Sequence, residues 1–234
     1  MPRSGACCRA CGYTENRQMA LVIFDLDGTL VDSVDDLCNS VNAARGYMGM
    51  PPLPHDVVAS YVGNGAPVLI RRAMGPEATE QQVEEALAFF LSYYREHMLD
   101  HTRPYPGVVE TLEKLHSRGV KMAVLTNKPQ RFSRDMCAGL GLAPYFFQIY
   151  GGNSFEQKKP DPVGIRTLMD EAQARPRETW MVGDSATDIL TARNAGVRSV
   201  GVTYGISPES LKEAPPDFVI HSMQELPALL EQKS

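Results

Sequence analysis

Six short apolar runs, continuous rather than alternating, constrain the fold of this chain more than any other feature of its sequence. They lie at residues 20–24, 121–125, 146–150, 179–182, 199–203 and 217–220. Continuous hydrophobicity is typical of strands that are covered on both faces, as they are in a parallel sheet. We therefore predict that these runs are the strands of one parallel sheet.

Segments with helical periodicity lie between the runs, and each ends at a glycine or just before a proline. They span residues 108–118, 130–140, 161–174 and 185–195. Such endings are common because glycine adopts the left-handed conformation easily and proline cannot continue a helix. Since strands and helices alternate, we predict an α/β core with a doubly wound, Rossmann-like parallel sheet over residues 19–32 and 105–234.

One stretch, residues 33–104, breaks the alternation. It contains no strand-like apolar run, and its apolar residues recur at helical spacing, as Leu37, Cys38 and Val41 do. We predict an all-helical insertion directly after the first strand. Its connections to the core are short, so we expect it to hinge over the end of that strand.

The overall composition excludes several classes of protein. Hydrophobic residues make up 43% of the 234 and charged residues 22%, which is ordinary for a globular protein with a buried core. A net charge of −5 gives no basic surface for nucleic acid, and no apolar run is long enough to cross a membrane. No apolar stripe marks an interface, so a monomer and a homodimer both stay open.

The first eighteen residues contain three of the five cysteines and no apolar stretch that would serve as a secretory signal. Cys8 and Cys11 form a C-x-x-C that could be half a zinc site or a redox pair, but no second pair or nearby histidine completes it. The uneven spacing does not indicate a disulfide framework. We expect residues 1–18 to be a disordered extension and the protein to be cytoplasmic.

Polar side chains gather where the predicted strands end. The segments concerned are Asp25-Leu26-Asp27-Gly28-Thr29, Thr126-Asn127-Lys128, Lys158-Lys159-Pro160 and Gly183-Asp184-Ser185, with Asp188 beyond the last. Open α/β sheets bind their ligands at the carboxyl ends of the strands. We therefore expect these groups to meet at one edge of the sheet.

The residue types in this group suit a metal ion and a phosphate. The carboxylates of Asp25, Asp27 and Asp184 repel one another unless a cation lies among them, and oxygen ligands suit Mg²⁺. Asp25 is then placed to form an aspartyl phosphate, and Asp27 to act as the acid and base.

A second set of residues supplies donors of the opposite sign, which suit a phosphoryl group. Its members are Thr126, Asn127 and a lysine. We favour Lys159 because it directly precedes Pro160, although Lys158 is its neighbour.

These motifs resemble those of the haloacid dehalogenase-like hydrolase superfamily. The matching residues, in order, are Asp25-x-Asp27-Gly28-Thr29, Thr126, Lys159-Pro160 and Gly183-Asp184-x₃-Asp188. The resemblance covers residues 20–231 and implies that residues 33–104 are the cap domain of that superfamily. No lysine precedes Lys114, so the insertion lacks the Schiff-base lysine of the phosphonate-cleaving relatives.

The resemblance also implies a role for each matching residue. It makes Asp25 the nucleophile and a Mg²⁺ ligand, and Asp27 the general acid and base, which gives its main-chain carbonyl to the metal. The remaining roles are phosphoryl binding by Thr126 and Asn127, charge compensation by Lys159, metal binding by Asp184 and orientation of the metal ligands by Asp188. The acid at position 27 favours phosphoryl transfer over dehalogenation.

Within the phosphatases, the chain is similar to the bacterial phosphoglycolate phosphatases. The similar segments are residues 25–33, 62–66, 105–108, 126–129, 158–162 and 201–205. This implies Mg²⁺-dependent hydrolysis of 2-phosphoglycolate, a small phosphomonoester, to glycolate and phosphate. Gly63 and Gly65 flank Asn64, so we expect a tight loop whose amide and N–H groups bind the substrate carboxylate.

Three other functions stay open on the sequence alone. The nearest is another sugar-phosphate or nucleotide phosphatase, and the second is a phosphomutase of the β-phosphoglucomutase type. The third is a non-catalytic phosphate-binding protein, although both Asp25 and Asp27 are present.

Overall fold

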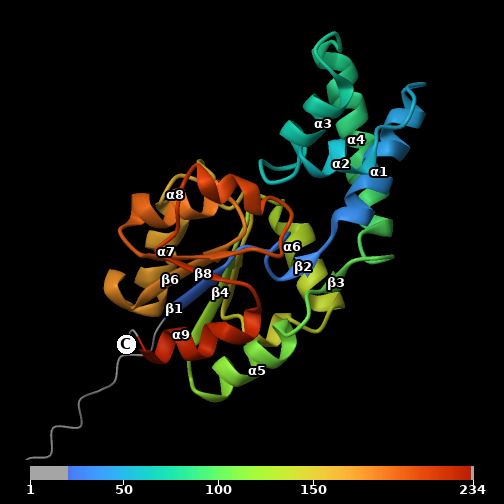
Figure 1. The fold of residues 1–234 in the computed structure, drawn as a ribbon. Coiled ribbons are helices and arrows are strands. Elements are labelled where there is room, and N and C mark those ends of the chain that lie inside the picture. The colour runs from blue at the N-terminus through green and yellow to red at the C-terminus, as the bar shows by residue number, and fades with distance from the viewer. Residues whose placement is uncertain (1–20, 233–234) are drawn as a thin grey trace, which may run out of the picture.

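The computed structural model describes residues 21–232, which form an α/β core that carries a projecting group of helices (Figure 1). The core sheet has the strand order β5-β4-β1-β6-β7-β8, and every neighbouring pair is parallel. The strands are β1 (Leu21–Phe24), β4 (Lys121–Leu125), β5 (Gln148–Tyr150), β6 (Thr179–Gly183), β7 (Arg198–Val202) and β8 (Phe218–Ile220). The predicted α/β fold with a parallel sheet is therefore confirmed. The predicted extension, residues 1–18, lies outside the described residues.

Helices cover both faces of the sheet. One face packs against α5 (Val108–Ser117), α6 (Gln130–Gly139) and α9 (Leu226–Gln232), and the other against α7 (Val163–Ala172) and α8 (Ala186–Ala195). Successive residues of β1 serve the two faces, since Val22 and Phe24 belong to the first apolar cluster and Leu21 and Ile23 to the second. This double burial explains why the sequence of the strand is continuously apolar.

The order of the strands reverses at β1. From this strand the chain builds outward to β4 and β5, and it then crosses to β6, β7 and β8 on the other side. The carboxyl ends of β1, β4 and β6 thus meet at a switch point, where open α/β sheets bind their ligands.

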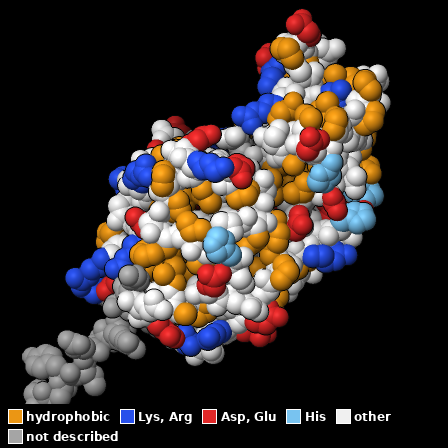
Figure 2. All heavy atoms as spheres, in the orientation of Figure 1, with side chains coloured by type: hydrophobic (Ala, Val, Ile, Leu, Met, Phe, Trp, Pro, Cys, Tyr) orange, Lys and Arg blue, Asp and Glu red, His pale blue; other side chains and the backbone are white. Residues whose placement is uncertain are grey.

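The insertion consists of four helices that pack against one another. They are α1 (Val34–Tyr47), α2 (His55–Ala59), α3 (Ala66–Met74) and α4 (Glu80–His97). Their apolar faces are buried as the helical spacing predicted, with Leu37, Cys38 and Val41 at most 5% exposed. In Figure 2 the insertion projects from the core as a lobe, and basic and acidic side chains are interspersed over this face of the molecule.

A two-stranded ribbon joins the insertion to the core. The strands β2 (Val31–Asp32) and β3 (Arg103–Pro104) pair antiparallel, and the buried Asp36 accepts hydrogen bonds from the N–H groups of His101 and Thr102. The sequence did not reveal this ribbon, because two residues give no periodicity and proline is rare in strands. Within residues 21–232, no helix combines the length and the apolar character that crossing a membrane requires.

Candidate active site

Three of the predicted site residues lie at the switch point of the sheet. Asp25 directly follows β1, Thr126 directly follows β4, and Asp184 directly follows β6. All three line a cavity of about 50 Å³ between the sheet and the insertion. The strand ends therefore bring together residues that lie far apart in the sequence.

Asp25 is a buried carboxylate that faces a buried lysine. Its Oδ1 lies 2.8 Å from Lys159 Nζ, an ion pair in which Oδ1 makes no well-aligned hydrogen bond. Burial raises the pKa of Asp25 to about 6; Lys159 opposes this rise, and the negative charge of Asp188 adds to it. Lys159 also donates to Asp188 Oδ1 at 2.6 Å, so one ammonium lies between two carboxylates.

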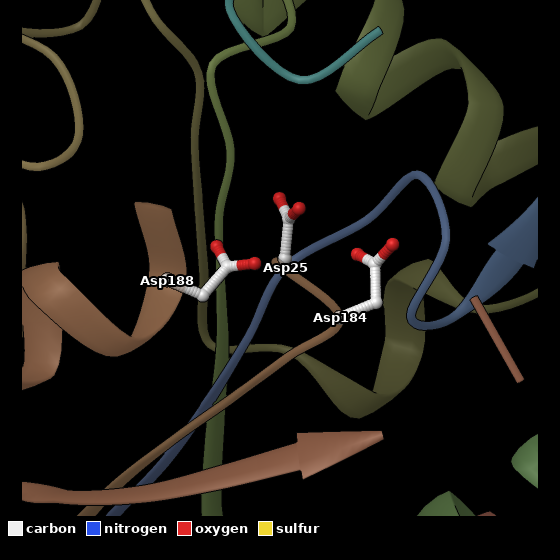
Figure 3. Close-up of side chains that lie close together, drawn as sticks. All are labelled: Asp25, Asp184 and Asp188. Atoms are coloured by element: carbon white, nitrogen blue, oxygen red, sulfur yellow. The ribbon is translucent and has the colours of Figure 1, made fainter. Parts of the chain in front are cut away.

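Asp184 completes a cluster of three buried carboxylates. Oxygen atoms of Asp25, Asp184 and Asp188 all lie within 4.8 Å of one another, and Figure 3 shows the three side chains converging from different segments of the chain. Burial, followed by the charges of Asp188 and Asp25, raises the pKa of Asp184 to about 7. A cation would relieve this repulsion, and the all-oxygen donor set fits a divalent metal ion.

Main-chain and side-chain donors fix the members of the cluster. Asp184 Oδ2 accepts the N–H groups of Ile206 and Ser207 at 2.8 and 2.9 Å. Asp188 Oδ2 accepts both the N–H and the hydroxyl of Ser185, the residue before α8. The protein's own donors therefore orient the carboxylates of Asp184 and Asp188.

The turn after Asp25 requires a glycine. Gly28 has a φ of +81°, and a Cβ at this position would lie 2.4 Å from a carboxylate oxygen of Asp184. Only a residue without a side chain allows the loop after β1 to approach the end of β6 this closely. The D-x-D-G sequence is thus explained by the close contact of two strand ends.

Asp27 lies outside the three-carboxylate cluster. Its Oδ1 accepts the hydroxyl of Ser33 at 2.6 Å and lies 2.9 Å from Lys128 Nζ, which is 3.1 Å from Oδ2. The side chain lines the cavity. The predicted metal contact of the Asp27 main-chain oxygen stays a prediction.

Two residues of this site received no role from the sequence, Lys128 and Tyr94. Lys128 Nζ donates to Tyr94 Oη at 2.6 Å as well as to Asp27, and it lies 4.6 Å from the centre of the Tyr94 ring. Burial alone would lower the pKa of Lys128, but Asp27 and Tyr94 raise it above its usual value. The available signal for Lys128 was its position as a basic residue directly after Thr126-Asn127. Tyr94 gave no such signal, because it continues the apolar spacing of α4.

Thr126 and Asn127 adjoin the cavity in different ways. Thr126 is buried, and its Oγ1 accepts the N–H of Lys128. Asn127 Nδ2 donates to the carbonyls of Gly63 and Lys159, while its buried Oδ1 has no partner among the described residues. The predicted phosphate contacts of both side chains stay predictions.

The loop around Asn64 lies against the core. Lys158 Nζ donates to the main-chain oxygen of Asn64 at 2.7 Å, so it is Lys159 and not Lys158 that faces Asp25. Gly63 and Gly65 line the cavity, whereas Asn64 itself is not among the lining residues. The predicted contact of the Asn64 amide with substrate stays a prediction.

The fold and this arrangement of residues define the class of the protein. The chain belongs to the haloacid dehalogenase-like hydrolase family, whose sequence pattern matches residues 22–202. A phosphoglycolate phosphatase of Vibrio vulnificus is 42% identical over 219 residues, which cover 90% of this chain and 95% of that protein. Phosphoglycolate phosphatase 1 of Pseudomonas aeruginosa is 42% identical over 221 residues, or 92% of this chain and 80% of its own.

A solved structure agrees with these sequence relatives. The crystal structure of a predicted phosphoglycolate phosphatase from Haemophilus somnus 129pt matches with a TM-score of 0.86 and 34% identity. The match covers 91% of this chain and 98% of the other, so it includes the insertion as well as the core.

Proposed function

We propose that this protein is a phosphatase that hydrolyses 2-phosphoglycolate to glycolate and phosphate with Mg²⁺ as its metal ion. The observation that carries the proposal is the pair of aspartates at the end of β1. Asp25 lies in the buried carboxylate cluster beside Lys159, and Asp27 lies two residues further on at the same cavity. The relatives named phosphoglycolate phosphatase support the choice of substrate.

The metal ion fits the carboxylates already described. Asp25 and Asp184 would hold it together with the main-chain oxygen of Asp27, and Asp188 would keep Lys159 and the first turn of α8 in place. When bound, Mg²⁺ draws charge from the phosphoryl oxygens and offsets the repulsion between them and the carboxylates.

The chemistry of the residues proceeds in two displacements at phosphorus. In the first, a carboxylate oxygen of Asp25 attacks, the bond from phosphorus to the leaving oxygen breaks, and Asp27 donates its proton to that oxygen. In the second, Asp27 accepts a proton from water, the water oxygen attacks phosphorus, and phosphate leaves while the carboxylate of Asp25 is restored. Lys159 remains beside Asp25 throughout and offsets its charge.

The size of the cavity favours a small substrate. At about 50 Å³ it has room for about four water molecules at roughly 10–15 Å³ each. A two-carbon leaving group suits this space better than a hexose does.

Phosphate release from a panel of phosphomonoesters tests the proposal. The panel is assayed with Mg²⁺ and with EDTA, for the unaltered protein, Asp25→Asn and a matched control, Asp170→Asn, at an exposed position of α7. We expect the highest kcat/KM for 2-phosphoglycolate, loss of activity in EDTA, and a fall of about 10⁴-fold or more in Asp25→Asn. Near-normal turnover by Asp25→Asn would contradict the mechanism, and a preference for a larger ester would contradict the substrate.

A further inference from the structure

Lys128 is the only basic residue among the described residues that line the cavity. Its ammonium group is buried and contacts both carboxylate oxygens of Asp27 and the hydroxyl of Tyr94. The other buried lysine of the site, Lys159, is engaged by Asp25 and Asp188. Lys128 is therefore the one lining side chain that can offer a positive charge to a substrate.

The insertion contributes no charge of its own to the cavity. Among the described residues, those of the insertion that line the cavity are apolar or glycine, apart from Tyr94 with its hydroxyl. A carboxylate that enters such a cavity loses its water and needs a charged partner in return. Only the core can supply this partner.

We propose that Lys128 binds the carboxylate of the substrate's leaving group and so selects phosphomonoesters that carry one, an inference that rests on the phosphatase function proposed above. The position of Asp27 supports it. As the acid for the leaving oxygen, Asp27 must lie within hydrogen-bonding distance of that oxygen, and Lys128 Nζ is only 2.9 Å from Asp27. In 2-phosphoglycolate a single methylene separates the leaving oxygen from the carboxylate carbon, so the carboxylate reaches the same neighbourhood.

Binding exchanges one carboxylate for another on Lys128. To reach the leaving oxygen, Asp27 turns away from the ammonium, and the substrate carboxylate takes its place beside Tyr94. A substrate without a carboxylate would leave the buried ammonium with one partner fewer, which is costly. Selection thus comes from the penalty on substrates that lack a carboxylate as much as from the attraction of Lys128 for substrates that carry one.

Tyr94 acts through Lys128 as a positioning residue. Its hydroxyl comes from α4 of the insertion, whereas Lys128 follows β4 of the core. The carboxylate receptor is therefore complete only while the insertion lies over the sheet.

Comparing 2-phosphoglycolate with 2-phosphoglycolamide, in which an uncharged amide replaces the carboxylate, tests the proposal without any change to the protein. The two esters have nearly the same shape and differ in charge. We expect the unaltered protein to have a kcat/KM about 10²–10⁴-fold higher for the carboxylate. Equal rates for the two esters would overturn Lys128 as a receptor while leaving the phosphatase in place, whereas no phosphate release from any ester would overturn the proposed function itself.

Variants then assign the preference to Lys128. Lys128→Met, with Lys128→Gln as a second form should the first not fold, is expected to reduce the ratio of the two kcat/KM values by about 10²-fold or more. Tyr94→Phe should reduce this ratio by about tenfold, and Lys114→Met, at an exposed position of α5, should not change it. Loss of activity toward both esters by the same factor would show that Lys128 serves Asp27 alone and would overturn the proposal.

Discussion

Replacing Asp184 with asparagine should stabilise the metal-free protein at pH 8, although it alters the centre of the site. Burial and the charges of Asp188 and Asp25 raise the pKa of Asp184 from 3.8 to about 7. Each pH unit between these values corresponds to about 1.4 kcal/mol. The ionised carboxylate therefore costs the folded state about 4 kcal/mol, a cost that a neutral amide avoids.

The sign of the pH dependence follows from the same values. The folded state holds this proton more tightly than the unfolded state, so the contribution to stability is complete below pH 3.8 and is lost as the pH rises through 7. Between pH 5 and pH 8 the free energy of unfolding should fall by about 3 kcal/mol from this group. Asp25, with a pKa raised to about 6, adds to the same trend.

Urea unfolding in EDTA at pH 5 and pH 8 measures the effect. Asp184→Asn should show a clearly smaller fall than the unaltered protein, because an amide does not titrate in this range. Its amide oxygen can still accept the N–H groups of Ile206 and Ser207, so the local structure should be kept. The exposed Asp170→Asn is the control and should retain the full fall. Added Mg²⁺ should stabilise the unaltered protein more at pH 8 than at pH 5, since it binds the ionised form. The same pH dependence in Asp184→Asn and the unaltered protein would contradict the raised pKa of Asp184.

Three further substitutions test other parts of the site. Gly28→Ala should destabilise the protein by about 1–3 kcal/mol in urea, because the new Cβ meets Asp184 and the φ is positive. Lys159→Met should cost about 3–5 kcal/mol in the same assay, since it leaves two buried carboxylates without their cation; an unchanged midpoint would contradict the ion pairs. Asn64→Ala should alter selectivity in the substrate panel more than kcat, and an unchanged profile would remove Asn64 from the site.

The architecture could be predicted from the sequence because a strand buried on both faces is apolar at every position. The run at β1 is apolar at every position, since Val22 and Phe24 face one layer of helices and Leu21 and Ile23 the other. The ends of such runs locate the site, which is why Asp25 could be named as a central residue. The order of the strands brings the ends of β4, β1 and β6 together, and with them the site residues that follow each strand.

Contacts between the core and the insertion could not be predicted in the same way. The sequence favoured Lys159 for the position beside Asp25, where the structure places it, but the contact of Lys158 with the main chain of Asn64 in the insertion left no signal. Tyr94 lies on the apolar face of α4, and its hydroxyl joins the site only through a hydrogen bond with Lys128, which comes from another part of the chain. Such pairings depend on tertiary packing rather than on local pattern.

The ribbon formed by β2 and β3 bears on how such proteins diversify. Because Val31 lies opposite Pro104, the two ends of the insertion enter and leave the core side by side. A replacement of any length would have to match only this one gap, and it would leave the registers of the main sheet untouched. Exchanging the insertion would then replace Tyr94 and the apolar residues that cover the cavity, while Asp25, the carboxylate cluster and Lys128 of the core stayed in place.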